Sequence, residues 1–239
     1  MRIDVVPTAD AVTPERVTGV TALVVDVLRA STTIITALGC GAAAIVPVGE
    51  PGEALRRGAD GALVAGERGA DKLEGFDLGN SPVEFSSAPL AGRTVVLTTS
   101  NGTRALLATR GAAAVGIAAL VNVSAAADWV VAAGRDTTVV CSGERGARSL
   151  DDSVCAGLLV ERLCARVPSA RLTPDAEDAV ATARPYAADI EKLARDSPWA
   201  RRLAAKGYGP DVAICLRVDA TALVPVYLAD VDKIVLGPR

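Results

Sequence analysis

The sequence predicts an α/β fold in three layers, α/β/α, with a mixed and largely parallel sheet. Short aliphatic runs end in polar or glycine-rich turns and give way to helical patterns, which is the alternation expected of such a sheet. Half of the 239 residues are hydrophobic but only 3% are aromatic, so Ala, Val, Leu and Ile must build the core, as in buried parallel strands. We therefore expect residues 1–239 to form a single α/β unit with a sizeable core.

The expected elements follow from where the apolar runs fall. Helical patterns over 26–38 and 101–109 each follow an aliphatic run. The expected strands are 22–25, 43–48, 62–65, 94–97, 137–141, 212–216 and 233–236. From about 166 to 211 the chain becomes charged, helical and punctuated by proline, which we interpret as a covering or dimer-contacting layer within a C-terminal elaboration over 166–239.

Two internal repeats predict that the sheet is built from related halves, about 21–92 and 93–165. The segment LVVDVLRASTTIITALGCGAAAI (23–45) aligns strand on strand with VVLTTSNGTRALLATRGAAAVGI (95–117). The pentapeptide GERGA occurs at 66–70 and again at 143–147, each time after an apolar run. Alanine-rich segments can align by chance, but a shared pentapeptide at the same relative place favours duplication.

Composition excludes several classes of function. The net charge is −3, from 25 basic and 28 acidic side chains that are interspersed, so neither a nucleic acid nor a membrane is expected as a partner. Five cysteines without a C-x-x-C pair, and an N-terminus without a signal-like stretch, favour the cytoplasm. Because histidine is absent, the chemistry must use carboxylates, hydroxyls, thiols, Lys, Arg or a metal held by oxygen.

The first candidate site segment is DVLRASTT, directly after the first predicted strand. Ligands of α/β sheets bind beyond the carboxyl ends of the strands. Asp26 stands at that end, and Arg29 offers bidentate contacts to an anion where a helix begins. Ser31 or Thr32 could simply cap the helix, but a cap does not account for the neighbouring acid and arginine.

The loop GERGADKLEGFDLGNSP (66–82) is the least generic stretch of the chain. It is long, glycine-rich and acidic, and such loops within compact domains are usually functional. Glu67 and Asp77 are candidate ligands for Mg²⁺, which takes one or two carboxylates together with water and phosphate oxygens. We interpret Asp71 and Glu74 as solvated surface acids.

Two further segments follow predicted strands. TTSNGT (98–103) offers hydroxyls and a glycine for an anion cradle, although Asn-Gly is also an ordinary turn. After SGERG (142–146) come Asp151 and Asp152, of which either could be a helix cap. A pair of acids at a phosphate site is better explained by a metal or by a base that activates water.

Three other interpretations fit poorly. Six residues separate Cys141 from Arg148, one more than in the loop of cysteine phosphatases, so Cys141 is not expected to be a nucleophile. A haloacid-dehalogenase-like site would need a second acid where Leu28 stands, and no G-x-G-x-x-G follows the first strand.

The segments VVDVLRASTTIITAL, GERGADKLEGFDLGNSPVEF, VVLTTSNGTRAL and CSGERGARSLDDSVCAG resemble the motif blocks of the 2-phosphosulfolactate phosphatase family. The C-terminal third matches more loosely, through RRLAAKGYGPDVAICLRVD. The resemblance implies a homodimeric, Mg²⁺-dependent hydrolase that converts 2-phospho-3-sulfolactate to 3-sulfolactate, a coenzyme M precursor. A phosphatase of another 2-hydroxycarboxylate ester, such as phospholactate, and a non-catalytic phosphate-ester-binding protein are the alternatives. Direct water attack and a covalent phospho-enzyme both stay open.

The candidate roles combine the chemistry of these segments with the resemblance. The expected catalytic residues are Asp26, Arg29, Glu67 and Asp152, and the expected metal ligands are Asp26, Glu67, Asp77 and Asp152. The expected substrate-binding residues are Arg68, Gly69, Asn80, Ser81, Thr99, Ser100, Asn101, Gly102, Ser142 and Gly143. We expect the site to lie where the two halves meet.

Overall fold

A computed structural model describes residues 1–237 of the chain. Its strands are β1 (Arg2–Val6), β2 (Thr21–Val25), β3 (Ala44–Pro47), β4 (Leu63–Arg68), β5 (Asp71–Lys72), β6 (Thr94–Thr98), β7 (Ala114–Ala118), β8 (Thr137–Cys141), β9 (Arg171–Leu172), β10 (Pro225–Leu228) and β11 (Lys233–Leu236). Its α-helices are α1 (Pro14–Val17), α2 (Ala30–Gly39), α3 (Pro51–Gly58), α4 (Pro82–Ser87), α5 (Gly102–Leu107), α6 (Val123–Ala133), α7 (Leu150–Arg166), α8 (Pro174–Ala183), α9 (Leu193–Asp196), α10 (Pro198–Ala205) and α11 (Gly209–Cys215). Short 3-10 helices are η1 (Ala9–Ala11), η2 (Leu120–Asn122), η3 (Arg184–Tyr186) and η4 (Ile190–Lys192).

The strands form one mixed sheet in the order β5-β4-β6-β3-β11-β10-β7-β2-β8-β1-β9. One block, β7-β2-β8-β1-β9, is parallel throughout, and so is the block β4-β6-β3. The hairpin β10–β11 joins them, because β10 pairs antiparallel with β7 and β11 pairs antiparallel with β3. The predicted α/β fold with a mixed, largely parallel sheet flanked by helices is confirmed.

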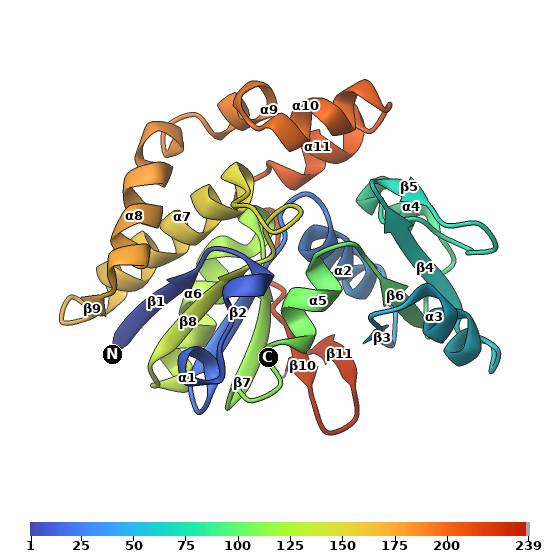
Figure 1. Ribbon diagram of the computed structural model, residues 1–239, viewed down its shortest axis with the longest axis horizontal. Coiled ribbons are helices and arrows are strands. Elements are labelled where there is room, and N and C mark those ends of the chain that lie inside the picture. Colours follow the sequence, from blue (N-terminus) through green and yellow to red (C-terminus); the bar gives the residue numbers. More distant parts are fainter. Residues whose placement is uncertain (238–239) are drawn as a thin grey trace.

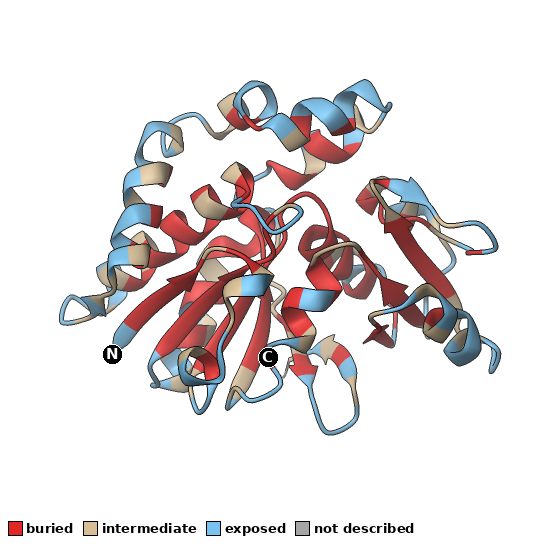
Figure 2. Cartoon of the chain, in the orientation of Figure 1, coloured by how far each residue is buried: buried red, intermediate tan, exposed pale blue. Residues whose placement is uncertain are grey.

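The two blocks splay apart, and α2 and α5 lie between them (Figure 1). Side chains alternate along β2, so that Leu23 packs with α6 and α7 on one face while Val24 packs with α2 and α5 on the other. Val96 of β6 faces a smaller cluster with α3. The strands are accordingly buried along most of their length (Figure 2).

The two predicted halves share one order of elements but exchange their first strands. Residues 21–68 run β2-α2-β3-α3-β4, and residues 94–141 run β6-α5-β7-α6-β8. In the sheet, β2 lies between β7 and β8, whereas β6 lies between β3 and β4. The evolutionary relationship of the halves stays a prediction, but neither block of the sheet is complete without a strand from the other half.

The sequence prediction was wrong for 212–216, where the structure has helix α11 instead of a strand. Val212 and Cys215 are buried three residues apart, which is helical spacing, and Pro210 lies in the first turn, where a helix tolerates it. An apolar run this short does not distinguish a strand from a buried helix. Strands β1, β5, β7, β9 and β10 were not predicted.

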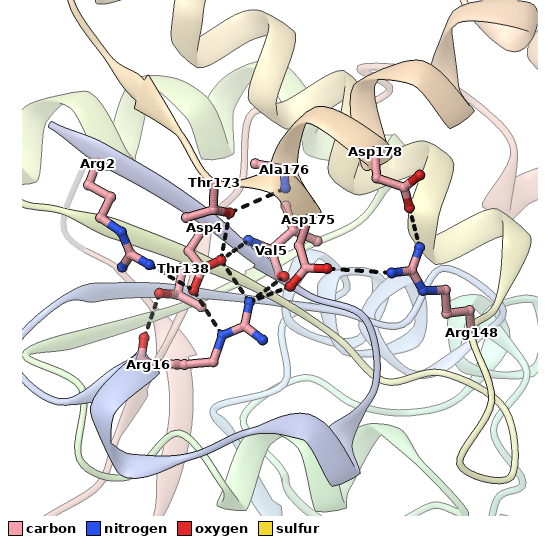
Figure 3. A network of polar contacts seen from close by, with 10 residues as sticks. All are labelled: Arg2, Asp4, Val5, Arg16, Thr138, Arg148, Thr173, Asp175, Ala176 and Asp178. Carbon is pink, nitrogen blue, oxygen red and sulfur yellow. Dashed lines mark hydrogen bonds and ion pairs between the residues drawn. The ribbon is translucent and has the colours of Figure 1, made fainter.

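A network of charged side chains surrounds β1 (Figure 3). The buried carboxylate of Asp4 accepts hydrogen bonds from Nε and Nη2 of Arg16, at 2.9 and 2.7 Å, and from Oγ1 of Thr173 at 2.8 Å. Arg16 also pairs with Asp175 of α8, which Arg148 contacts in turn. Because a buried charge is tolerated only when it is paired, this network explains how an acid occupies the middle of a strand. It also fixes the base of the loop between β8 and α7.

Candidate active site

The loops that follow β2, β4, β6 and β8 line a single cavity of about 130 Å³. The start of α7 and one tryptophan of α10 complete it. The lining residues are Asp26, Leu28, Arg29, Glu67, Gly69, Asn80, Ser100, Asn101, Ser142, Gly143, Glu144, Arg145, Ser149, Asp151, Asp152 and Trp199. The cavity therefore gathers residues from both predicted halves and from the C-terminal segment.

Asp26 is held at the start of α2. Its Oδ1 accepts a hydrogen bond from the backbone N–H of Ala30 at 3.0 Å, and its own N–H donates to Oγ of Ser31 at 2.9 Å. Only 7% of the residue is exposed. Burial, with a further contribution from the negative charge of Glu67, raises the pKa of Asp26 to about 6. This carboxyl group is therefore able to exchange a proton near neutral pH.

Asp152 connects two strand-end loops. Its Oδ1 accepts from the N–H of Val27 at 2.9 Å, and its Oδ2 accepts from Oγ of Ser142 at 3.0 Å and from the N–H of Gly143 at 3.1 Å. Burial, followed by the charges of Asp151 and Asp26, raises the pKa of Asp152 well above its ordinary value. Asp152 thus connects the loops after β2 and β8, and its buried surroundings disfavour the ionised form of its carboxyl group.

Glu67 connects two further loops that line the cavity. Its Oε1 accepts from the N–H of Ser100 at 2.7 Å, and its Oε2 accepts from the N–H of Ala70 at 2.8 Å and from Oγ of Ser100 at 3.2 Å. Glu67 therefore joins the loop after β4 to the loop after β6, as Asp152 joins the loops after β2 and β8.

Arg29 lies in the cavity wall with its charge already compensated. Nη1 donates to Oδ2 of Asp211 at 2.7 Å, Nη2 donates to the carbonyl of Ala70 at 2.9 Å, and the guanidinium stacks over Tyr208 at 4.3 Å from the ring centroid. Both partners of the ion pair are 2% exposed at their side chains. The preceding peptide bond, Leu28–Arg29, is cis.

The C-terminal segment contributes to the site, which the sequence did not indicate. Trp199 donates from Nε1 to the carbonyl of Leu28 at 2.7 Å. Oγ of Ser197 donates a hydrogen bond to Oδ1 of Asp151 at 3.0 Å. Burial raises the pKa of Asp151. Lys206 contacts the loop after β4 through the carbonyl of Gly69. No motif marked Ser197 or Trp199, and the loosely matching block that contains Lys206 gave no role to it, because each residue acts through a partner far away in the sequence.

Most of the predicted site residues lie in the cavity, namely Asp26, Arg29, Glu67, Gly69, Asn80, Ser100, Asn101, Ser142, Gly143 and Asp152. The remaining ones lie outside its lining. Arg68 donates hydrogen bonds to the carbonyls of Glu67 and Gly49 and to Thr98. Ser81 caps α4 and donates to Asp211. Thr99 accepts a hydrogen bond from the N–H of Thr103. Gly102 packs behind Asp26. Asp77 accepts from the N–H of Val64 at 2.8 Å and lies away from the cavity, so we do not retain it as a metal ligand.

Cys141 is fully buried in a core cluster, and burial raises the pKa of its thiol well above the usual value. A thiol in this state is a poor nucleophile. The structure thus agrees with the exclusion of cysteine phosphatase chemistry.

The acids of the cavity are compatible with magnesium. No group of three or more His, Cys, Asp or Glu in residues 1–237 is arranged as a metal cage. Mg²⁺ needs no such cage, because it is commonly held by one or two carboxylates, several waters and the substrate. Asp26, Glu67 and Asp152 share a small cavity in which their charges repel, and a divalent cation between them would relieve that repulsion.

A sequence model of the 2-phosphosulfolactate phosphatase family matches residues 6–230. The chain belongs to the 2-phosphosulfolactate phosphatase family. It is 38% identical over 212 residues, 85% of the chain and 86% of the relative, to a probable 2-phosphosulfolactate phosphatase of Caldanaerobacter subterraneus subsp. tengcongensis. A protein of the same name from Clostridium acetobutylicum is 35% identical over 235 residues, 95% of the chain and 97% of the relative.

Membership of the 2-phosphosulfolactate phosphatase family confirms the predicted family and the predicted class of enzyme, a phosphoric monoester hydrolase.

No helix in the described part of the chain is both long and apolar enough to cross a bilayer.

Proposed function

We propose that this protein hydrolyses 2-phosphosulfolactate to 3-sulfolactate and inorganic phosphate with the help of Mg²⁺. The observation that carries the proposal is the set of buried acids, Asp26, Glu67 and Asp152, gathered in one cavity of a chain from this family. A cavity that bound anions alone would gain nothing from these acids. They become useful when a cation is placed between them and the phosphoryl oxygens.

Asp26 and Asp152 are the carboxylates that would hold the metal, with Glu67 beside them. Bound Mg²⁺ would neutralise charge on the phosphoryl group. Asp26 would act there as an ionised carboxylate, because a metal ligand must be deprotonated; its raised pKa of about 6 in the metal-free cavity reflects a charge that the cation would compensate. Ser100, Asn101 and Ser142 would orient the phosphoryl group at the strand ends.

The cytoplasmic location, the homodimer and the supply of a coenzyme M precursor are part of the same proposal. They rest on the family resemblance and, for the location, on five cysteines without a C-x-x-C pair. Light scattering of the purified protein at several concentrations tests the dimer directly.

The proposed reaction is tested by measuring phosphate release from a panel of 2-phospho acids, with Mg²⁺ and with a chelator. We expect release from 2-phosphosulfolactate that requires Mg²⁺. Equal kcat/KM values for 2-phosphosulfolactate and 2-phospholactate would show that the sulfonate is not recognised. Binding of the esters without phosphate release would support a binding protein instead of an enzyme.

A further inference from the structure

Arg145 differs from Arg68, the arginine of the other GERGA segment, and from Arg29. Its exposed guanidinium lines the cavity and makes no hydrogen bond or ion pair with any residue in 1–237. By contrast, Arg29 is neutralised by Asp211, and Arg68 donates to the carbonyls of Glu67 and Gly49. The two arginines that the sequence suggested as anion clamps are thus already engaged, whereas Arg145 is not.

The backbone at Arg145 is also unusual. Glu144 and Ala147 exchange backbone hydrogen bonds of 2.8 and 2.9 Å, so that Arg145 and Gly146 are the central residues of a tight turn. Both have positive φ, 51° for Arg145 and 79° for Gly146. This conformation favours Asn, Asp or Gly at the first central position, and a side chain such as Arg costs about 1 kcal/mol or more there. Local folding therefore does not explain an arginine at this position.

The charges around the cavity indicate what Arg145 would bind. The buried acids Asp26, Glu67 and Asp152 occupy its interior, where the phosphoryl group and the cation are proposed to bind. Arg145 is exposed and therefore lies at the rim. The acids of the interior would repel a second anionic group of the substrate, so that group needs a positively charged partner outside the interior. An unpaired guanidinium offers the bidentate contacts that a carboxylate or sulfonate accepts.

We propose that Arg145 binds an anionic group of the substrate other than the phosphate, its carboxylate or its sulfonate, and so determines the preference for phosphate esters of acids. This inference rests on the proposed function, since it names the part of the substrate that Arg145 recognises. It does not require that the protein turn the ester over.

The test is calorimetric titration of the protein with two ligands. One is 3-sulfolactate, which has a carboxylate and a sulfonate but no phosphate, and the other is inorganic phosphate. The variant is Arg145→Asn, because Asn suits the turn and removes the guanidinium. We expect the Kd for 3-sulfolactate to rise roughly 10- to 100-fold, as for loss of a charge-assisted hydrogen-bonded pair, and the Kd for phosphate to change less than about threefold. The Kd of Arg145→Lys for 3-sulfolactate should lie between those of the wild type and of Arg145→Asn.

Arg135→Asn is the matched control, because this exposed arginine lies between α6 and β8, at the opposite end of β8 from Ser142. Wild-type affinity for 3-sulfolactate in Arg145→Asn, an equal loss of affinity for phosphate, or no binding of 3-sulfolactate to the wild type would each overturn the inference. If 3-sulfolactate binding depends on Arg145 but no ester releases phosphate, the proposed function fails and the inference about Arg145 stands.

Discussion

The backbone N–H of Val27 donates a hydrogen bond of 2.9 Å to Oδ1 of Asp152, a residue that follows it by 125 positions. Val27 follows β2 and Asp152 lies in the first turn of α7, so this contact joins the two predicted halves at an acid that lines the cavity. It depends on the strand exchange, which places β2 beside β8. The site is therefore a product of the sheet topology as much as of its motifs.

Asp26→Asn should stabilise the metal-free protein above about pH 6. The pKa of Asp26 is raised from 3.8 to about 6, so the folded state binds the proton more tightly than the unfolded state does. The cost of ionising Asp26 in the folded state is therefore absent below pH 3.8, grows between pH 3.8 and about 6, and is constant above that. We expect a gain on the order of 3 kcal/mol in the free energy of unfolding at pH 8, from about 1.4 kcal/mol for each pKa unit.

The measurement is urea denaturation in the presence of a chelator at pH 8 and at pH 4.5. The difference between Asp26→Asn and wild type should shrink at the lower pH. A variant that is less stable than wild type at pH 8 would show that the charge of Asp26 is not disfavoured in the folded state.

Removing the charge of Arg29 should destabilise the fold strongly. Arg29→Ala leaves Asp211 as an unpaired charge at a side-chain exposure of 2%, and breaking a buried ion pair in this way costs about 3–5 kcal/mol. Lys192→Ala is the control, since its pair with Asp189 is 3.7 Å long and half-exposed and should contribute less than about 1 kcal/mol. Equal urea midpoints for the two variants would contradict the structural role of Arg29.

Gly102→Ala should displace Asp26. A Cβ at Gly102 would lie 2.6 Å from Oδ2 of Asp26 and 2.6 Å from Cβ of Ala30, so these groups would have to move apart. We expect kcat to fall more than about 10-fold, because a shift of a catalytic group by a fraction of an ångström is costly. Gly209→Ala, also at the first residue of a helix but with no neighbour within 4 Å, should keep wild-type kcat.

The sequence was sufficient to predict the fold class and much of the candidate site, because aliphatic runs followed by polar turns indicate both. Asp26 and Glu67 were found in this way, as acids at strand ends, and Asp152 as one of a pair of acids opening a helix. The strand exchange was not predictable, since the pairing of β2 with β8 depends on long-range packing that no local pattern records.

The two copies of GERGA show how identical residues can acquire different environments. In the first copy, Arg68 donates to backbone carbonyls and to Thr98. In the second copy, Arg145 stands in a tight turn at the rim of the cavity. The pentapeptide alone does not distinguish them, because the residues that follow, and the strands that lie beside each copy, differ.

The most direct test of the account is phosphate release from 2-phosphosulfolactate by Asp26→Asn, compared with Asp77→Asn and wild type in the presence of Mg²⁺. Asp77 is a matched control, because it is an acid of the same glycine-rich segment as Glu67 but lies outside the cavity. We predict a loss of kcat of about 100-fold or more for Asp26→Asn and nearly wild-type activity for Asp77→Asn. Full Mg²⁺-dependent activity in Asp26→Asn would contradict the proposed site.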